Sequence, residues 1–149
     1  MNYMVLAIEE ALRGIKNQDG GPFGCCIVKD GKIIALSHNK VILTHDPTSH
    51  AEIEAIRTAS KKLGTHDLEG CVLYTTCEPC PMCLFAIMWA KIETVYFGCD
   101  RKDAANIGFR DDKFYSYLKG NIDINLKQMN RKECLDLFQK YKDSSHENY

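Results

Sequence analysis

The sequence predicts an α/β protein in which helices cover both faces of a mixed β-sheet, that is, a three-layer α/β/α sandwich. Three observations lead to this fold class. Amphipathic helical patterns alternate with short apolar strand patterns over most of the chain, and such alternation favours right-handed crossovers within one sheet. A DG pair joins two of the strand patterns as a hairpin would. The 149 residues, without a repeat or linker, fit a single domain over residues 1–149 that buries its own core.

The first part of the chain predicts a helix followed by a hairpin. The helix runs to about Lys16, because apolar residues recur at intervals of three and four. These residues are Val5, Ile8, Leu12 and Ile15. A Gly/Pro loop over residues 19–24 follows. Two strands are then predicted, Cys25–Val28 and Lys32–Ser37, and Asp30-Gly31 between them is a strong hairpin signal.

A second helix is predicted to begin near His50 and to end at Gly64. Either Thr48 or Ser49, just after a proline, can cap its first turn. A glycine is the usual residue after a last helical turn. The apolar stripe of this helix consists of Ile53, Ile56, Ala59 and Leu63.

The next elements are a strand at Cys71–Thr75, a helix at Cys80–Ala90 and a strand at Thr94–Gly98. Pro81 falls in the first turn of this helix, where its missing N–H does no harm. The last third of the chain is less regular. Three further helices are expected there: one capped within residues 100–103, one bracketed by Gly108 and Gly120, and one that begins with a capping box of Asn130 and Glu133.

Composition excludes several classes of protein. The net charge of −1, from 19 basic and 20 acidic residues, gives no electrostatic reason to expect a nucleic-acid partner. The N-terminal helix carries Glu9 and Glu10, so it is neither a signal peptide nor a membrane span. Without an export signal, the eight cysteines indicate reduced thiols and a metal site rather than a disulfide scaffold. We therefore expect a cytoplasmic protein.

Two short motifs, thirty residues apart, carry the chemistry: His50-Ala51-Glu52 and Pro79-Cys80-Pro81-Met82-Cys83. One imidazole and two thiolates suit one Zn²⁺ per subunit, and a fourth position left to water is typical of a catalytic site. A carboxylate that stays off the metal, here Glu52, can move protons between the water and a leaving group.

The spacing of these residues predicts where the site lies. Positions i and i+2 point to different sides of a helix, so His50 and Glu52 converge only at a site beyond the N-terminal end of their helix. Cys80 and Cys83 lie one turn apart at another helix start. The partial positive charges of two helix N-termini would then stabilise thiolates and a developing oxyanion.

A plainer interpretation of the same residues is a structural zinc or iron–sulfur module without turnover. Cys77, Cys80 and Cys83 form C-x2-C-x2-C, but the fourth cysteine of ferredoxins is missing, since Ile87 stands at that position. Cys77 is expected to pack at a strand end. The remaining cysteines are expected to be small buried residues: Cys25, Cys26, Cys71, Cys99 and Cys134. The other histidines, His38 among them, are expected to be surface or structural residues.

H-x-E…P-C-x-x-C is the signature of zinc-dependent nucleobase deaminases. The chain resembles the cytidine deaminase-like superfamily, and within it the bacterial guanine deaminases and their nucleoside-deaminase relatives. The motifs that carry the likeness are GGPFG, IVKDG, HNKV, DPTSHAEIEAIR, LYTTCEPCPMC, WA and DAANIGF. The resemblance implies a five-stranded mixed sheet between helices. It also implies that His50, Cys80 and Cys83 hold the zinc and that Glu52 is the proton shuttle.

The same resemblance implies the substrate contacts. Phe23 would stack on the base, while Asn39 and the Ala51 backbone would hydrogen-bond to it. Trp89 matches an aromatic residue near the pocket. In the guanine branch an acidic residue of the DAANIGFRDD segment helps to bind the ring and relay protons, and Asp111 is that acid in an ungapped comparison, with Asp112 as the alternative.

Guanine deaminases of this type also close the site with a C-terminal segment that ends in Tyr and is exchanged between the subunits of a homodimer. Tyr149 fits that role, and residues 120–149 would be the exchanged segment. As a chain end after a polar stretch, Tyr149 would by default be disordered.

The leading functional hypothesis is hydrolytic deamination of a free purine base, guanine to xanthine and ammonia. The alternatives within enzymes are a tRNA adenosine deaminase and another base or nucleoside deaminase, acting on cytosine or guanosine. A nucleobase is therefore the expected partner, with neither nucleic acid nor membrane involved.

Overall fold

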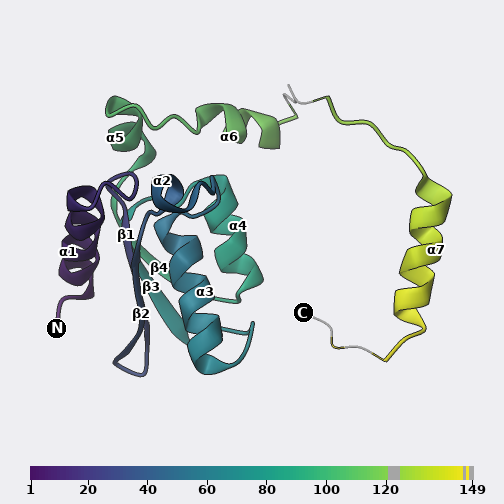
Figure 1. Ribbon diagram of the computed structural model, residues 1–149, viewed down its shortest axis with the longest axis horizontal. Coiled ribbons are helices and arrows are strands. Elements are labelled where there is room, and N and C mark those ends of the chain that lie inside the picture. Colours follow the sequence, from purple (N-terminus) through teal and green to yellow (C-terminus); the bar gives the residue numbers. More distant parts are fainter. Residues whose placement is uncertain (121–124, 146, 148–149) are drawn as a thin grey trace. The chain divides into compact units, whose positions relative to one another are not determined.

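The computed structural model describes residues 1–120, 125–145 and 147 of the chain (Figure 1). It divides into two compact units, residues 1–112 and 113–149. The first unit contains α1 (Tyr3–Lys16), β1 (Gly24–Lys29), β2 (Lys32–His38), α2 (Val41–Thr44), α3 (Ala51–Leu63), β3 (Cys71–Cys77), α4 (Pro81–Trp89), β4 (Thr94–Cys99) and α5 (Arg101–Asn106). The helices that follow are α6 (Asp112–Leu118) and α7 (Arg131–Lys142).

The sheet is mixed, as predicted, with the strand order β2-β1-β3-β4. β1 is antiparallel to both β2 and β3, and β3 is parallel to β4. The expected fifth strand is absent from the described residues, so that part of the prediction is wrong. It came from the resemblance alone, because the residue pattern shows only four strands. After β4 the described chain forms the short helices α5 and α6, and a strand would need an extended apolar stretch in their place.

The hairpin between β1 and β2 turns at the predicted residues. Asp30 and Gly31 both have positive φ, 50° and 72°, which is the backbone of the two-residue turn that matches strand twist. Asp30 and Gly31 lie directly between the paired residues Lys29 and Lys32. Gly24, at the other end of β1, pairs with His38 at the end of β2. The hairpin therefore brings the 19–24 loop next to the residue before Asn39.

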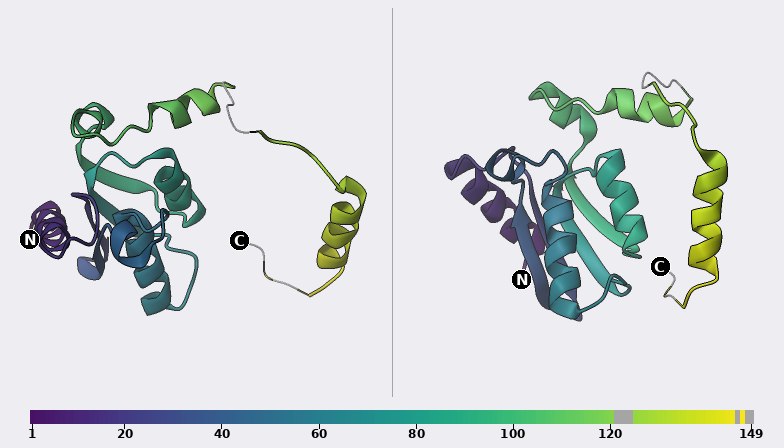
Figure 2. Two further views of the ribbon diagram at one scale, coloured as in Figure 1. Left: turned by 45° about the horizontal axis from the view of Figure 1, so that its top comes forward. Right: turned by 45° about the vertical axis from the view of Figure 1, so that its right-hand side comes forward.

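Side chains of β1 alternate between two buried faces, which gives the three layers their cores. Ile27 packs with Leu73 and with Ala55 of α3 in one cluster, whereas Cys26 packs with Ala7 of α1 in another. Figures 1 and 2 show α1 on one side of the sheet and α3 and α4 on the other. The three-layer α/β/α architecture is thus confirmed, because a strand buried on both faces needs helices on both sides.

The buried face of α1 is not the apolar stripe from which the helix was predicted. Ala7, Ala11 and Gly14 face the sheet, while the large residues of the stripe are exposed: Val5, Ile8, Leu12 and Ile15. Gly24 shows the physical reason, since a side chain added there would overlap the carbonyl oxygen of Ala7. Helix and strand approach so closely that only small residues fit between them.

Two other local predictions need correction. Cys99 and Cys134 are exposed rather than buried, although all eight cysteines are free as expected. Asn130 precedes α7 with a left-handed backbone, φ 52°, and makes no side-chain cap hydrogen bond, so the predicted capping box does not form. By contrast, the expected capping box at the start of α5 is present, between Asp100 and Asp103.

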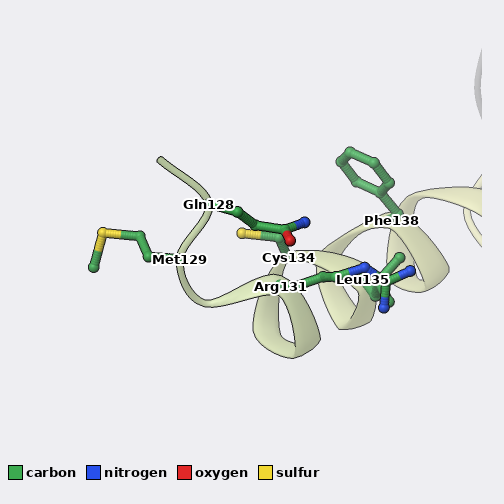
Figure 3. Close-up of a pocket in the computed structure, with 6 residues that line it drawn as sticks. All are labelled: Gln128, Met129, Arg131, Cys134, Leu135 and Phe138. Atoms are coloured by element: carbon green, nitrogen blue, oxygen red, sulfur yellow. The ribbon is translucent and has the colours of Figure 1, made fainter. Parts of the chain in front are cut away.

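The C-terminal unit carries a surface pocket of about 240 Å³ on α7 and the residues before it (Figure 3). Its lining consists of Gln128, Met129, Arg131, Cys134, Leu135 and Phe138. None of the predicted site residues belongs to this lining, so the pocket is separate from the chemistry considered below. Within the described residues, no helix is both long enough and apolar enough to cross a membrane.

Candidate active site

The three predicted metal ligands come together at the start of two helices. His50 is the residue before α3 and Cys80 the residue before α4, and Cys83 lies in the first turn of α4. Pro81 at the first position of α4 favours a helix start there. Neither helix has a side-chain cap, so its first N–H groups and their partial positive charge face the ligand group.

The ligand atoms have the separations that a zinc ion requires. The Nδ1 atom of His50 lies 3.6 Å from the sulfur of Cys80 and 3.5 Å from that of Cys83, and the three atoms all lie within 4.8 Å of one another. Tetrahedral Zn²⁺ with its ordinary bond lengths places nitrogen and sulfur ligands about 3.6 Å apart. This donor set, one imidazole and two thiols on one small sphere, therefore fits zinc with a position to spare.

Electrostatics within the group favours a thiolate at Cys80. Hydrogen bonds with Cys83 and His50, together with the charge of the imidazole, lower the pKa of Cys80 to about 4. The pKa of His50 is raised in turn, chiefly by its hydrogen bond with Cys80. The pKa of Cys83 is raised, first because its thiol donates to Cys80 and second because it is buried. An anionic sulfur beside a polarised imidazole is a site for a soft cation.

Glu52 lies in the first turn of α3, beside the ligand group but not part of it. Its side chain is buried, with 5% of the residue exposed, and its Oε1 atom accepts a hydrogen bond of 2.7 Å from the Thr75 hydroxyl. A further hydrogen bond of Glu52 contributes to the raised pKa of Cys83. A buried carboxylate held next to a metal position can accept and release a proton there.

Three loops form what we call the rim of this site: residues 19–24, 39–40 and 45–50. Backbone hydrogen bonds join them. The amide of Asn39 donates to the carbonyl of Phe23 at 3.0 Å, and the amide of Lys40 donates to the carbonyl of Ser49 at 2.9 Å. Phe23, Asn39 and His50 are therefore neighbours, as expected for residues that share a pocket. Asn39 is buried, and its Oδ1 atom accepts from the Val41 amide at 3.0 Å. This contact directs its NH₂ group away from the turn.

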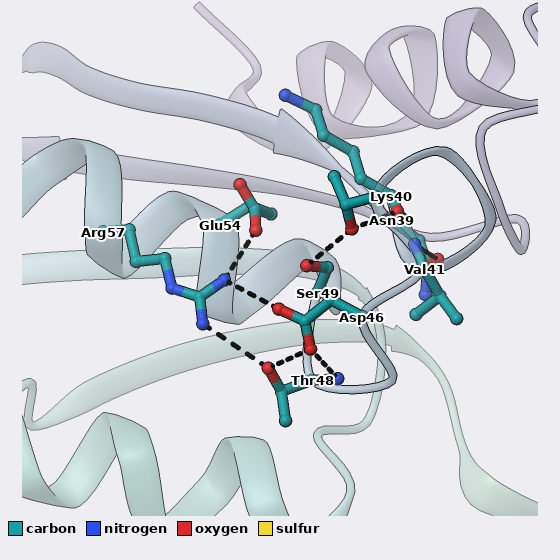
Figure 4. Close-up of polar contacts among 9 residues, drawn as sticks. Asn39, Lys40, Val41, Asp46, Thr48, Ser49, Glu54 and Arg57 are labelled. Atoms are coloured by element: carbon teal, nitrogen blue, oxygen red, sulfur yellow. Dashed lines mark hydrogen bonds and ion pairs between the residues drawn. The ribbon is translucent and has the colours of Figure 1, made fainter.

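The loop that separates Asn39 from His50 is held by its own polar contacts (Figure 4). The Asp46 carboxylate accepts from the amide and hydroxyl of Thr48 at 2.8 and 2.7 Å, and these bonds lower its pKa. Arg57 on α3 bridges Asp46 and Glu54, at 3.8 and 2.8 Å. The loop is thereby tied to the body of α3, which keeps both of its ends in place.

Ala51 is completely buried at the first position of α3, between His50 and Glu52. Its amide belongs to the helix N-terminus, where N–H groups lack intrahelical partners. The backbone N–H that the resemblance assigns to substrate binding is therefore at the correct end of the helix to serve as a donor.

Asp111 lies within the electrostatic reach of the ligand group. Burial raises the pKa of its carboxyl, and the negative charge of Cys80 raises it further. The alternative acid, Asp112, is the first residue of α6, and its side chain lies outside the described part of the structure. The choice of Asp111 as the second acid stays a prediction.

Phe109 was not among the predicted site residues, although it stands in the DAANIGF motif. Its ring meets the ring of Phe23 edge to face, with centroids 4.9 Å apart. A side chain on Gly21 would overlap both rings. Phe109 therefore packs against Phe23, the predicted stacking residue, and supports its ring. Thr75, the partner of Glu52, was also missed, and only its position in LYTTC beside the cysteine motif could have indicated it.

Trp89, predicted to lie near the pocket, is not beside the metal ligands of its own chain. Trp89 is the last residue of α4, at the opposite end from Cys80 and Cys83, and it is 67% exposed. A rigid nine-residue helix separates its two ends by about 12 Å, so Trp89 cannot reach its own subunit's metal ligands. Tyr149 lies outside the described residues.

The iron–sulfur interpretation finds no support. Within the described residues, the group of His50, Cys80 and Cys83 is the only one of three or more potential ligands with metal-site spacing. Cys77 does not join it. Its thiol instead faces the Asp100 carbonyl at the end of β3, 3.9 Å away, and burial raises its pKa to about 12, so it is a packed thiol as expected.

Comparisons with known proteins agree with this site. The sequence model of the cytidine and deoxycytidylate deaminase zinc-binding region matches residues 1–99. The guanine deaminase of Bacillus subtilis is 50% identical over 113 residues, which are 76% of this chain and 72% of that protein. The tRNA-specific adenosine deaminase of Aquifex aeolicus is 45% identical over 101 residues, 67% of this chain and 66% of that protein.

Among solved structures, the X-ray structure of the guanine deaminase from Bacillus subtilis matches with a TM-score of 0.94 and 41% identity, covering 100% of this chain and 99% of that one. The similarity extends beyond the matched zinc-binding region into the part of the chain for which the sequence motifs are weakest.

Proposed function

This chain belongs to the cytidine and deoxycytidylate deaminase family of zinc-dependent hydrolases, and we propose that its own substrate is the free base guanine, which it converts to xanthine and ammonia. The observation that carries the proposal is the buried Glu52 carboxylate, held off the metal position but beside it. That arrangement suits exchange of an amino group for a hydroxyl, since both water and amine need a proton carrier.

Zinc bound by His50, Cys80 and Cys83 would supply one element of the chemistry, a water molecule acidified enough to act as a nucleophile near neutral pH. The residues of the chain do the rest. Thr75 donates to Oε1 of Glu52, which leaves Oε2 to take a proton from the water. Glu52 would deliver this first proton to the ring nitrogen as the oxygen joins the carbon. It would then take the second proton from the new hydroxyl and pass it to the amine, so that ammonia leaves and the carbonyl of xanthine remains.

Binding of the base would fall to the rim. Phe23 would stack on the ring of the base, and Phe109 supports Phe23 by an edge-to-face contact. The NH₂ group of Asn39 and the N–H of Ala51 donate hydrogen bonds to the ring acceptors. Asp111, whose pKa is raised by burial and by the charge of Cys80, would serve as the second acid that contacts the ring.

A homodimer with exchanged C-terminal segments completes the proposal. What supports it is α7, which carries exposed apolar residues such as Leu137 and Phe138, a surface that a partner subunit would cover. Tyr149 would then reach the pocket of the partner. Removal of the last few residues of the chain should lower turnover. Unchanged kinetics would contradict the idea that Tyr149 closes the pocket of the partner.

A panel of substrates tests the function directly. Ammonia release is measured with guanine, guanosine, cytosine and a tRNA anticodon stem-loop as substrates. The proposal requires guanine to have the highest kcat/KM. A preference for the stem-loop, lost as salt is raised, would instead establish the tRNA deaminase alternative that the 45% identical relative keeps open.

The role of Glu52 is tested by Glu52→Gln, which keeps the shape and removes the base. The variant should retain one zinc per chain and lose nearly all turnover. Glu54→Gln on the same helix is the matched control, because Glu54 contacts Arg57 rather than the site and its loss should leave kcat unchanged. Turnover by Glu52→Gln at the wild-type rate would exclude the proton-carrier role.

A further inference from the structure

A buried cluster of ionisable side chains lies next to the rim and has no part in the chemistry above. The Nδ1 atom of His38 lies 2.8 Å from Oε1 of Glu10, and its Nε2 atom lies 2.7 Å from Oδ2 of Asp19. All three residues are buried. They come from three separate elements: the middle of α1, the loop after α1 and the end of β2.

The geometry gives every member of this cluster a polar partner. Each ring nitrogen of His38 faces one carboxylate oxygen, and carboxylates accept hydrogen bonds from ring N–H groups. Arg13, at the surface, adds a cation with Nη1 3.4 Å from the other oxygen of Glu10. Buried polar groups are retained when they are paired in this way.

The ring of His38 is also packed tightly against the backbone of α1. A side chain on Gly14 of α1 would overlap the Cγ and Cδ2 atoms of the ring, so the helix backbone lies directly against it. The ring therefore lies between the backbone of α1 and two carboxylates, and its two hydrogen bonds link α1, the following loop and the end of β2.

Contacts continue from the cluster to the rim of the site. The carbonyl of Asp19 accepts hydrogen bonds from the amides of Ile42 and Leu43, at 3.0 and 2.9 Å, and so holds the short helix α2 that follows Asn39. Gly20 lies against Oδ1 of Asn39 so closely that a side chain there would overlap it. Asn39 thus contacts Gly20, the residue after Asp19, and directly follows His38 in the chain, so both of its neighbours are joined to the cluster.

We propose that His38, with Glu10 and Asp19, is a positioning residue for substrate binding: the buried cluster holds the 19–24 loop and Asn39 in the orientation that contacts the base. The inference rests on the proposed function for the identity of the base. It goes beyond that function because the cluster touches neither the metal ligands nor Glu52 and acts only through Asn39 and its loop.

Two variants test the proposal. His38→Leu removes both hydrogen bonds of the ring and leaves two carboxylates without their partner, whereas Asp19→Asn keeps the shape and removes one carboxylate. Both should keep one zinc per chain. For guanine we expect KM to rise about tenfold, equivalent to about 1.4 kcal/mol, while kcat changes less than about threefold because the groups that meet the transition state are untouched.

The matched control is Tyr3→Ala. Tyr3 anchors the other end of α1, through a hydrogen bond from its hydroxyl to the Gly31 carbonyl at 3.1 Å and a ring contact with Tyr74. Its loss should lower the melting temperature without changing KM. If His38→Leu or Asp19→Asn lowers the melting temperature but leaves KM at the wild-type value, the cluster is merely structural and the proposal is overturned.

Two further readouts separate this inference from the proposed function. Amide hydrogen exchange at Asn39, Ile42 and Leu43 should accelerate in Asp19→Asn and stay unchanged in Tyr3→Ala, whatever the substrate is. Binding of 8-azaguanine to the zinc-loaded protein should weaken about tenfold in parallel with KM. A wild type that releases no ammonia from guanine contradicts the proposed function, whereas exchange rates in Asp19→Asn equal to those of the wild type contradict the positioning role. If His38→Leu does not fold, Asp19→Asn decides.

Discussion

The hydrogen bond from Thr75 to Glu52 gives the sharpest prediction, and Thr75→Val is the change that removes it. The bond is 2.7 Å long, Thr75 is fully buried and Glu52 nearly so. Valine has nearly the volume of threonine, so no cavity forms, and the cost is that of a buried carboxylate oxygen left without its donor. A hydrogen bond to a charged group contributes about 1.5–3 kcal/mol.

We expect Thr75→Val to lower the free energy of unfolding by that amount, about 1.5–3 kcal/mol. The same bond orients the carboxylate that carries the proton. If its full energy is used in the transition state, kcat falls about ten- to a hundredfold, since about 1.4 kcal/mol corresponds to a factor of ten. Urea unfolding of the zinc-loaded protein and steady-state ammonia release measure the two effects.

Two control variants isolate the bond. Thr75→Ser restores the hydroxyl and should recover most of kcat. Thr76→Val removes a different hydroxyl on the same strand, the acceptor for the Gly24 amide at 3.1 Å, and should cost stability without a comparable loss of kcat. A Thr75→Val enzyme with wild-type stability and kcat would refute the idea that this hydroxyl holds Glu52.

Three further predictions concern the rim and its support. Asp111→Asn should lower kcat about a hundredfold, as loss of an acid–base group does, and Asp112→Asn should not; the reverse result would assign the second acid to Asp112. Phe109→Leu should raise KM about two- to tenfold, because the edge-to-face contact with Phe23 contributes about 0.5–1.5 kcal/mol, and an unchanged KM would exclude a supporting role. Asp46 has a lowered pKa because the residue two positions on donates two hydrogen bonds to it, so its contribution to stability is present above the ordinary carboxyl pKa of about 3.9 and disappears as pH falls below it. The difference in melting temperature between Asp46→Asn and the wild type should therefore shrink from pH 6 to pH 3, and a constant difference would contradict this.

Local sequence patterns predicted much of the fold and the metal site. A helix start depends on a few adjacent residues, so Pro81 was enough to place the start of α4. The start of α3 near His50 was also predicted correctly, but its predicted cap was wrong: His50 is the N-cap, and no side chain caps the helix. The same local signals placed the turn at Asp30 and Gly31. The CxxC spacing places the two cysteines about one helical turn apart. Cys80 and Cys83 could therefore be assigned to one face of a helix from their spacing alone.

Other features depend on packing between distant segments and could not be found in this way. The side of α1 that faces the sheet is chosen by the close approach of Gly24, not by the position of its largest apolar residues. The fifth strand, expected from resemblance, is replaced in the described residues by helices. Trp89 lies one helix length from the metal ligands, a separation that follows only from the straightness of α4.

Residue types at short spacings were enough to predict the chemistry of this protein, because they include both the ligand set and a carboxylate that is suited to carry protons. What holds that chemistry in place follows from the packing of the folded chain. Thr75 reaches Glu52 across 23 positions, and His38 reaches Glu10 across 28. Such partners are selected by the distance between a strand and a helix, and a pattern of neighbouring residues carries no information about that distance.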